Sequence, residues 1–350
     1  MKIALDVFGG DFAPMANIEG ASIYLNEYNN SAAGLILVGD EKTIETALRS
    51  YKYNREKVEI LHTTEFVDMH EKPSRIFKKK PDSSLVKSIQ LVKDGKANAA
   101  VSAGNTGALL ASSLFLIGKI PGIRRPAFAP FIPSSKGGFI LCDAGANADS
   151  KPHHLVQFAL MACAYLEHLE NRNNPRVALL NIGSEASKGN ELTTTTYPML
   201  QELVEHFNFI GNIEARYILE GKADVVICDG FTGNIVLKLT EGIITHLMEW
   251  FQDLFQTHTG DFKLSSEFLS ILKEIQNTLD HEEHGATPLL GINGVVMKSH
   301  GTATARCISN SLLAAQKTVE GNLIDDIAVR LSKYKAIIED SSKIGEGNPV

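Results

Sequence analysis

A short apolar run leads straight into a polar turn in the stretch Val225-Val226-Ile227-Cys228-Asp229-Gly230-Phe231-Thr232-Gly233-Asn234. A run of this length, rich in valine and isoleucine, predicts a strand that is buried inside a sheet. The turn after it is rich in glycine, which lets backbone N–H groups approach a ligand closely. An apolar segment of this kind, followed by a longer amphipathic one, is typical of a parallel sheet covered by helices.

The same alternation of short apolar runs and longer amphipathic segments continues over most of the chain, so the predicted fold class is α/β. We expect a single domain over residues 1–340 and a polar tail at residues 341–350. The predicted strands cover residues 2–6, 35–38, 58–61, 99–102, 139–142, 177–181, 225–228 and 295–298.

Five of these strands end in glycine together with aspartate or asparagine. The carboxyl ends of parallel strands meet at one edge of the sheet, where open α/β proteins bind ligands. One such loop would more often be an ordinary turn, but five together favour a binding crevice. The residues assigned to it are Asp6, Gly9, Gly10, Asp11, Gly104, Asn105, Thr106, Gly107, Asp143, Gly145, Asn147, Gly183, Ser184, Glu185, Gly189, Asn190, Asp229, Gly230, Phe231, Thr232 and Gly233.

Composition excludes several classes of protein. The 350 residues carry 34 Lys and Arg against 41 Asp and Glu, a net charge of -7, which opposes a general basic field for nucleic acid. The four cysteines have no C-x-x-C spacing, which disfavours a zinc cluster or a disulfide framework and fits a reducing cytosol. Cys142 and Cys228, which precede two of the glycine loops, are expected to be buried rather than acyl carriers. No apolar run approaches ~18 residues, so any membrane contact should be peripheral.

Several catalytic signatures are absent from the sequence. There is no G-x-x-x-x-G-K-[ST], no G-x-G-x-x-G after a strand, no H-E-x-x-H and no G-x-S-x-G. Nucleotide hydrolysis, dinucleotide binding, zinc peptidase and α/β-hydrolase chemistry are therefore disfavoured, and no cofactor or metal is expected.

A protruding helical hairpin is predicted over residues 235–281, where apolar residues recur at helical spacing on both sides of a Gly260 turn. The tip would gather large apolar side chains where a turn is normally polar. They would contact a membrane surface or a partner subunit, or pack beneath the turn, and these alternatives stay open. The tip residues are Leu254, Phe255, Phe262 and Leu264. Two more helices are expected, at residues 302–320 and 323–340.

Lys188 lies in a glycine-rich loop that leads into a predicted helix. A cation beside a helix N-terminus would hold phosphate well. An ordinary solvated surface lysine remains an equal alternative.

Ordered motifs along nearly the whole chain resemble those of the bacterial phosphate acyltransferases, which convert acyl-(acyl-carrier-protein) and inorganic phosphate into acyl phosphate for phospholipid synthesis. Two departures are the Val7-Phe8 pair, where the family usually has Ala-Met, and Thr287, which follows Gly285-Ala286 without the family's second glycine. The motifs are Asp6-Val7-Phe8-Gly9-Gly10-Asp11, Ser102-Ala103-Gly104-Asn105-Thr106-Gly107-Ala108, Arg125-Pro126-Ala127, Asp143-Ala144-Gly145-Ala146-Asn147, Lys188-Gly189-Asn190-Glu191, Asp229-Gly230-Phe231-Thr232-Gly233-Asn234 and Ser299-His300-Gly301.

The resemblance implies a three-layer α/β/α fold with a mostly parallel sheet, like that of the isocitrate and isopropylmalate dehydrogenases and the phosphate acetyltransferases. It also implies a homodimer in the cytoplasm, peripherally attached to the cytoplasmic membrane. Its partners would be acyl carrier protein, inorganic phosphate and a downstream glycerol-3-phosphate acyltransferase.

The implied reaction brings phosphate against a thioester carbonyl. We expect Lys188 to neutralise the phosphate and Asn234 to donate a hydrogen bond to the oxyanion that develops. His300 is expected to hand a proton to the departing thiol, or only to cap the following turn. The aspartates of the loops would repel phosphate, so we expect them to orient the loops by accepting backbone N–H bonds.

The acyl carrier is acidic in this family, so a basic surface should bind it. The densest basic cluster is Arg75, Lys78, Lys79 and Lys80, with Arg124 and Arg125 as a second candidate. Rival functions are a metal-dependent hydroxyacid dehydrogenase of the same fold, a phosphate acetyltransferase that uses coenzyme A thioesters, and a non-catalytic membrane scaffold. For the dehydrogenase, Asp143 and Asp229 would be possible metal ligands.

Overall fold

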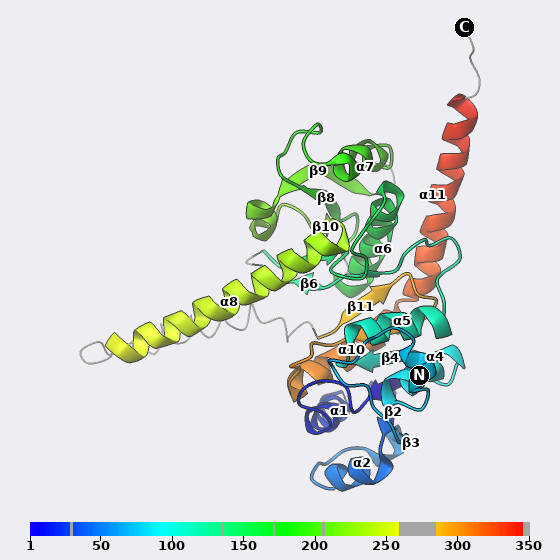
Figure 1. Ribbon diagram of the computed structural model, residues 1–350, viewed down its shortest axis with the longest axis vertical. Coiled ribbons are helices and arrows are strands. Elements are labelled where there is room, and N and C mark those ends of the chain that lie inside the picture. The colour runs from blue at the N-terminus through cyan, green and yellow to red at the C-terminus, as the bar shows by residue number, and fades with distance from the viewer. Residues whose placement is uncertain (29–30, 135, 171, 205–206, 259–284, 346–350) are drawn as a thin grey trace.

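The computed structural model describes residues 1–28, 31–134, 136–170, 172–204, 207–258 and 285–345, and the strands within these ranges form two sheets (Figure 1). The first sheet has seven strands in the order β3-β2-β1-β4-β12-β11-β5. Its first five strands are parallel, whereas β11 is antiparallel to both of its neighbours. The strands are β1 (Lys2–Asp6), β2 (Gly34–Gly39), β3 (Val58–His62), β4 (Ala99–Ser102), β5 (Ala127–Phe128), β11 (Thr287–Leu290) and β12 (Val295–Lys298).

The second sheet has five strands in the order β6-β7-β10-β8-β9, and only β6 runs antiparallel. They are β6 (Phe131–Ile132), β7 (Phe139–Cys142), β8 (Arg176–Asn181), β9 (Asn208–Glu214) and β10 (Val225–Ile227). The chain crosses from one sheet to the other between β5 and β6, over Ala129 and Pro130. Proline cannot donate a ladder hydrogen bond, which suits this break between the sheets.

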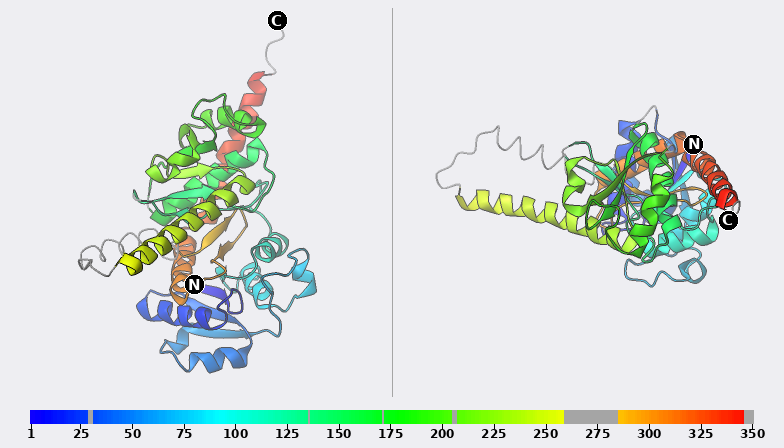
Figure 2. Two further views of the ribbon diagram at one scale, coloured as in Figure 1. Left: turned by 60° about the vertical axis from the view of Figure 1, so that its left-hand side comes forward. Right: turned by 90° about the horizontal axis from the view of Figure 1, so that it is seen from above.

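Helices cover the sheets, and α8 projects away from the body of the molecule (Figure 2). Their bounds are α1 (Met15–Glu27), α2 (Glu41–Leu48), η1 (Arg55–Lys57), α3 (Ile76–Lys79), α4 (Ser84–Lys93), α5 (Thr106–Leu116), α6 (Pro152–Glu170), α7 (Glu191–Gln201), η2 (Ala215–Glu220), α8 (Gly230–His258), α10 (Ala305–Glu320) and α11 (Leu323–Gly345). Within the described residues, no helix is both long and apolar enough to cross a membrane.

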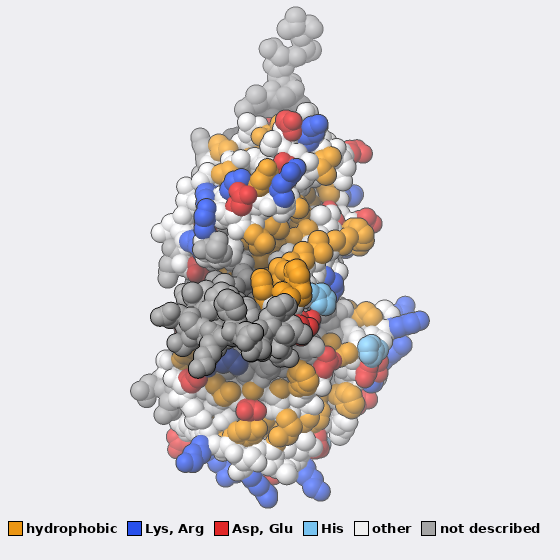
Figure 3. Space-filling model, turned by 90° about the vertical axis from the view of Figure 1, so that its left-hand side faces the viewer, with side chains coloured by type: hydrophobic (Ala, Val, Ile, Leu, Met, Phe, Trp, Pro, Cys, Tyr) orange, Lys and Arg blue, Asp and Glu red, His pale blue; other side chains and the backbone are white. Residues whose placement is uncertain are grey.

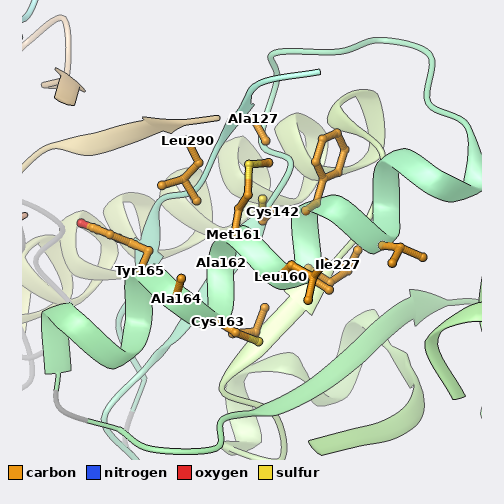
Figure 4. Packing of buried hydrophobic residues seen from close by; sticks show 14 of the residues in the cluster. Ala127, Cys142, Leu160, Met161, Ala162, Cys163, Ala164, Tyr165, Ile227 and Leu290 are labelled. Atoms are coloured by element: carbon orange, nitrogen blue, oxygen red, sulfur yellow. The ribbon is translucent and has the colours of Figure 1, made fainter. Parts of the chain in front are cut away.

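Helix α6 is buried along most of its length, and the hydrophobic cluster around it includes residues of both sheets. Met161 packs beside Leu290 of β11 and Cys142 of β7 (Figure 4). In the first sheet, Ile3 and Leu5 pack with residues of α1, α2 and α10. Burying one large apolar side chain contributes about 1.5–3 kcal/mol, so these clusters hold the strand ends in place.

The predicted α/β class with mostly parallel strands is confirmed, and all eight predicted strands are present. The expectation of one continuous sheet was wrong, because the short strands β5, β6 and β11 were not predicted and they are where the chain divides between two sheets. Strand β9 was also missed. Two of these strands have only two residues and β11 contains Pro288, so none of the three shows a strand pattern.

The helix boundaries differ from the prediction at their capped ends. Helix α8 begins at Gly230 rather than residue 235, because the Asp229 carboxylate accepts a hydrogen bond from the main-chain N of Thr232 at 2.9 Å. Helix α10 begins after Thr304, whose side chain caps it. Helix α11 continues to Gly345, into the segment predicted as a tail. The predicted second helix of the hairpin lies outside the described residues.

Candidate active site

A cavity of about 350 Å³ lies between the two sheets, of a size typical for small-molecule sites. The first sheet contributes Thr106 and residues 298–301, and the second contributes Ala144. One face of α8 forms a third wall, from Asn234 to Thr245. The segments that follow β4, β7 and β12 therefore meet at this cavity with α8, the helix that follows β10.

The loops after β1 and β4 are locked together. The hydroxyl of Ser102 donates to the carboxylate of the buried Asp6 at 2.7 Å and accepts from the main-chain N of Gly104 at 3.0 Å. Burial raises the pKa of Asp6. A Cβ at Gly9 would lie 2.6 Å from the main-chain N of Gly104, so this contact requires glycine. Asn17 completes the first loop by donating to the main-chain oxygen of Gly9 at 2.8 Å.

The β1 loop also contacts the loop after β12. The main-chain N of Asp11 donates to the oxygen of Gly301 at 2.8 Å. Gly10 has a φ of 103°, which favours glycine, and its Cα faces Gly301 and Ala103. The β1 loop thus supports the cavity wall at Gly301 without being part of the lining.

Asn105 has two structural functions. Its side-chain oxygen caps α5 by accepting from the main-chain N of Ala108 at 3.0 Å. Its side-chain nitrogen donates to the main-chain oxygens of Met69 and Glu71, both at 2.9 Å. A Cβ at Gly107 would lie 2.7 Å from the Pro73 ring. The segment around residues 69–73 is therefore held at the edge of the cavity, and Met69 lines it.

The buried carboxylate of Asp143 stabilises the conformation of the loop that follows β7. Its carboxylate accepts hydrogen bonds from the main-chain N of Phe128 at 2.9 Å, of Ala146 at 3.1 Å and of Asn147 at 2.8 Å. Burial raises its pKa. The Asn147 amide binds both this carboxylate and the main-chain oxygen of Pro126. These bonds make Asp143 an organiser of loop structure.

The first turn of α8 packs against this loop. A Cβ at Gly230 would lie 2.4 Å from the Asp143 carboxylate. The hydroxyl of Thr232 donates to Asp229 at 2.7 Å, which fixes the start of the helix. Asn234 follows in the wall of the cavity, and a Cβ at the neighbouring Gly145 would lie 3.6 Å from the Asn234 side chain. Within the described residues, the Asn234 amide makes no hydrogen bond. Phe231 is exposed.

The loop that follows β8 contacts β9 and does not line the cavity. The side chain of Asn181 donates to the main-chain oxygen of Lys188 at 2.9 Å, and that of Asn212 donates to Glu185 at 2.8 Å. Asn190 caps α7 through the main-chain N of Thr193 at 3.0 Å. Lys188 is exposed and is not among the residues that line the cavity. The other loop residues assigned to the site, Gly183, Ser184, Glu185, Gly189 and Asn190, do not line the cavity either.

Lys298 is a cavity residue that the sequence argument missed. It is the last residue of β12, is partly buried, and donates to the main-chain oxygen of Ala103 at 3.1 Å and to that of Ser299. Burial lowers its pKa to about 8. In the sequence, Lys298 could have been found as a single lysine at the carboxyl end of a predicted strand, directly before the Ser299-His300-Gly301 motif.

His300 also lines the cavity, and it contacts its own turn, with Nδ1 2.7 Å from the hydroxyl of Thr302. The thiols of Cys142 and Cys228 are buried, and burial raises the pKa of both well above the ordinary value. Neither is suited to carry an acyl group as a thiolate. Within the described ranges, no three His, Cys, Asp or Glu side chains form a cluster that could hold a metal ion.

The basic residues of the two predicted docking clusters differ in their contacts. Lys80 pairs with Glu71 and donates to the main-chain oxygen of Phe66. The Nζ of Lys78 lies 5.6 Å from the centre of the Phe115 ring, and the residue is exposed. The remaining basic residues of the two clusters are exposed, namely Arg75, Lys79, Arg124 and Arg125.

An apolar stripe runs along the outer face of α8. Its side chains recur every three or four residues, each is more than a third exposed, and they form part of the hydrophobic surface in Figure 3. The stripe consists of Phe231, Ile235, Leu239, Ile243, Leu247, Trp250 and Leu254. Of the predicted tip residues, the side chain of Phe255 and all of Phe262 and Leu264 lie outside the described residues.

Solved structures share this fold at low sequence identity. A phosphotransacetylase from Streptococcus pyogenes superimposes with a TM-score of 0.63 at 16% identity, covering 91% of this chain and 94% of that one. A 4-hydroxythreonine-4-phosphate dehydrogenase from Klebsiella pneumoniae gives 0.50 at 13% identity, covering 91% and 98%. The prediction that this chain shares its fold with acyl-transferring enzymes and with dehydrogenases is therefore confirmed.

Sequence comparison identifies the family. The model of the family described as "Fatty acid synthesis protein" matches residues 1–326. The phosphate acyltransferase of Halothermothrix orenii is 44% identical over 334 residues, which cover 95% of this chain and 99% of the relative. That of Clostridioides difficile is 42% identical over 335 residues, covering 95% and 97%. The chain is therefore an acyltransferase that belongs to the phosphate acyltransferase family.

Proposed function

We propose that this protein transfers a long-chain fatty acyl group from acyl-(acyl-carrier-protein) to inorganic phosphate, and that the acyl phosphate then serves glycerol-phosphate acylation. The observation that carries the proposal is the cavity between the sheets. Its lining combines polar groups at the strand ends and along α8 with apolar side chains from α8, β5 and β6, so one site can hold both a charged acceptor and a hydrocarbon chain.

The apolar part of the lining suits a long chain. Leu237 and Ile244 of α8 line the cavity together with Phe131 and Ile132 of β6. The lining residues from Asn234 to Thr245 span eleven helical steps, or about 16 Å along the helix axis. The hydrocarbon core of a membrane is about 30 Å thick and two acyl chains deep, so one long chain needs about 15 Å.

The chemistry needs no covalent enzyme intermediate. A phosphate oxygen attacks the thioester carbon and forms the new C–O bond, and the oxyanion that develops accepts a hydrogen bond from the Asn234 amide at the positive end of α8. The C–S bond then breaks, and the pantetheine thiolate takes a proton from His300. Lys188 stays a candidate for neutralising phosphate, on the strength of the family motif alone.

The carrier protein would dock beside the cavity. Asn105 ties residues 69–71 to the cavity edge, and the chain then continues into α3, where Lys78 and Lys79 are exposed. Because the carrier is acidic, this surface would steer it so that its pantetheine arm enters past Met69.

Two further contacts complete the proposal. The apolar stripe of α8, from Phe231 to Trp250, would be covered by a second copy of the chain, which makes the protein a homodimer. The far end of the helix, at Leu254 and Phe255, would hold the dimer on the inner face of the cytoplasmic membrane, where the acyl phosphate is used by a glycerol-3-phosphate acyltransferase.

The deciding experiment incubates the protein with palmitoyl-(acyl-carrier-protein), with and without inorganic phosphate. Acyl phosphate is trapped with hydroxylamine, and the free carrier thiol is measured in parallel. Equal, phosphate-dependent formation of both products is expected. Carrier binding without turnover would indicate a scaffold instead, and turnover with coenzyme A thioesters alone would indicate an acetyltransferase-like enzyme.

A further inference from the structure

We infer that Lys298, at the carboxyl end of β12, is the cation that binds the phosphate substrate in the cavity. This inference rests on the proposed function and adds to it the residue that holds the acceptor. It gives Lys298 the charge-neutralising role that the sequence motif suggests for Lys188.

The first support is the placement of the ammonium group. Lys298 lines the cavity together with His300 and Asn234, and Asn234 is the proposed donor to the oxyanion. Its Nζ donates to the main-chain oxygens of Ala103 and Ser299. A lysine ammonium has three N–H donors, so these two bonds fix its position and leave one for a ligand.

The second support is that, among the described residues, no carboxylate forms an ion pair with the Lys298 ammonium group. Across the described part of the chain, no Asp or Glu oxygen lies within 4 Å of the Lys298 ammonium. Asp6 lies at the end of β1, which is separated from β12 by β4, and its carboxylate accepts a hydrogen bond from Ser102 rather than from Lys298. A poorly hydrated cation without an ion pair is costly in free energy. An anion that enters the cavity would remove that cost.

The groups that face Lys298 come from several elements. Asp6 and Asp11, in and after β1, and Cys307 on α10 favour the protonated amine, whereas Lys238 on α8 disfavours it. Burial outweighs them and brings the pKa of Lys298 to about 8. The amine is thus mostly protonated at neutral pH and loses its charge as the pH rises through 8. Phosphate binding should therefore weaken above pH 8, and bound phosphate should raise the pKa of Lys298.

A comparison with Lys188 supports the assignment of phosphate binding to Lys298. Lys188 is exposed in a loop that does not line the cavity, and exposed charges interact weakly with ligands because water and salt screen them. Lys298 is held by the backbone in a site from which water is partly excluded, where a charge acts more strongly.

The first test does not depend on turnover. The intact protein is labelled with acetic anhydride across a pH series, with saturating inorganic phosphate or with chloride at equal ionic strength, and acetylation of Lys298 is measured by mass spectrometry. We expect an apparent pKa near 8 in chloride, with phosphate protecting Lys298 and raising that pKa. Equal labelling in the two salts would overturn the inference. If the wild-type protein made no acyl phosphate, the proposed function would fail, but this measurement would still decide about Lys298.

The second test uses variants. Lys298→Gln should raise the KM for phosphate about 30-fold or more, with little change in the KM for the acyl carrier. Lys298→Arg keeps the charge, so the loss of activity above pH 8 should disappear even if the rate is lower. Lys317→Gln, an exposed lysine on α10, is the matched control and should behave as wild type. A phosphate KM that rises in Lys188→Gln but not in Lys298→Gln would refute the assignment.

Discussion

Gly233 packs directly onto the main-chain oxygen of Asp143, so closely that a Cβ at Gly233 would lie 1.9 Å from that oxygen. This contact joins the first turn of α8 to the β7 loop. It thereby fixes the position of Asn234, the next residue, in the cavity wall. The geometry of the site thus depends on a glycine that carries no functional group.

Gly233→Ala should therefore damage both stability and activity. The added methyl group must push α8 away from the β7 loop, and we expect a loss of about 1–3 kcal/mol in the free energy of unfolding, measured with urea. Gly242→Ala is the matched control in the same helix, because a Cβ there meets nothing within 4 Å. It should be neutral or slightly stabilising, since alanine favours helix. Equal stability of the two variants would show that the contact with Asp143 does not matter.

Asn234→Ala should lower kcat for acyl phosphate formation by about 100-fold, the usual effect of removing one oxyanion donor. The KM for phosphate should change little, because Asn234 is assigned to the thioester oxygen. Circular dichroism and the urea midpoint should match wild type, since the amide makes no hydrogen bond within the described residues. A near-wild-type kcat would remove Asn234 from the mechanism.

Sequence reasoning succeeded where pattern and chemistry coincide, as in β10 and its capped turn at Asp229. Val225–Ile227 is a buried parallel strand, and the turn after it begins the helix that carries Asn234. It failed for strands and site residues whose place depends on contacts with residues far away in the sequence. Two-residue strands such as β5 and β6 exist only because they pair with β11 and β7. The cavity role of Lys298 follows from burial between neighbouring strands, which a local sequence pattern does not record.

Leu237→Trp should shorten the preferred acyl chain. Leu237 faces the cavity, and the larger ring would occupy the space assigned to the distal methylene groups. We expect the ratio of kcat/KM for palmitoyl to that for octanoyl carrier substrate to fall at least about tenfold, because each excluded methylene forfeits about 0.8 kcal/mol. Leu219→Trp, exposed in η2 and outside the cavity, is the control. An unchanged ratio would place the chain elsewhere.

Charge reversal at Lys78 and Lys79 should raise the KM for the acyl carrier and leave the KM for phosphate unchanged. Both side chains are exposed, so the effect should act through the association rate and should shrink at high salt. The control reverses Lys93 and Lys96, at the end of α4, which alters the net charge equally. If both pairs raised the KM alike, general repulsion rather than docking would be the cause.

Substitutions at the two ends of the α8 stripe should separate its two proposed functions. Glutamate at Leu239 and Ile243, near the body of the molecule, places charges in the proposed dimer interface and should yield monomers in sedimentation velocity. Glutamate at Leu254 and Phe255 should leave the dimer intact but release it from anionic phospholipid vesicles in a flotation assay, because the helix end would no longer bury apolar area in the membrane. Each variant is the control for the other. Vesicle binding that survives the second change, or a dimer that survives the first, would show that the stripe does not have the function assigned to that end.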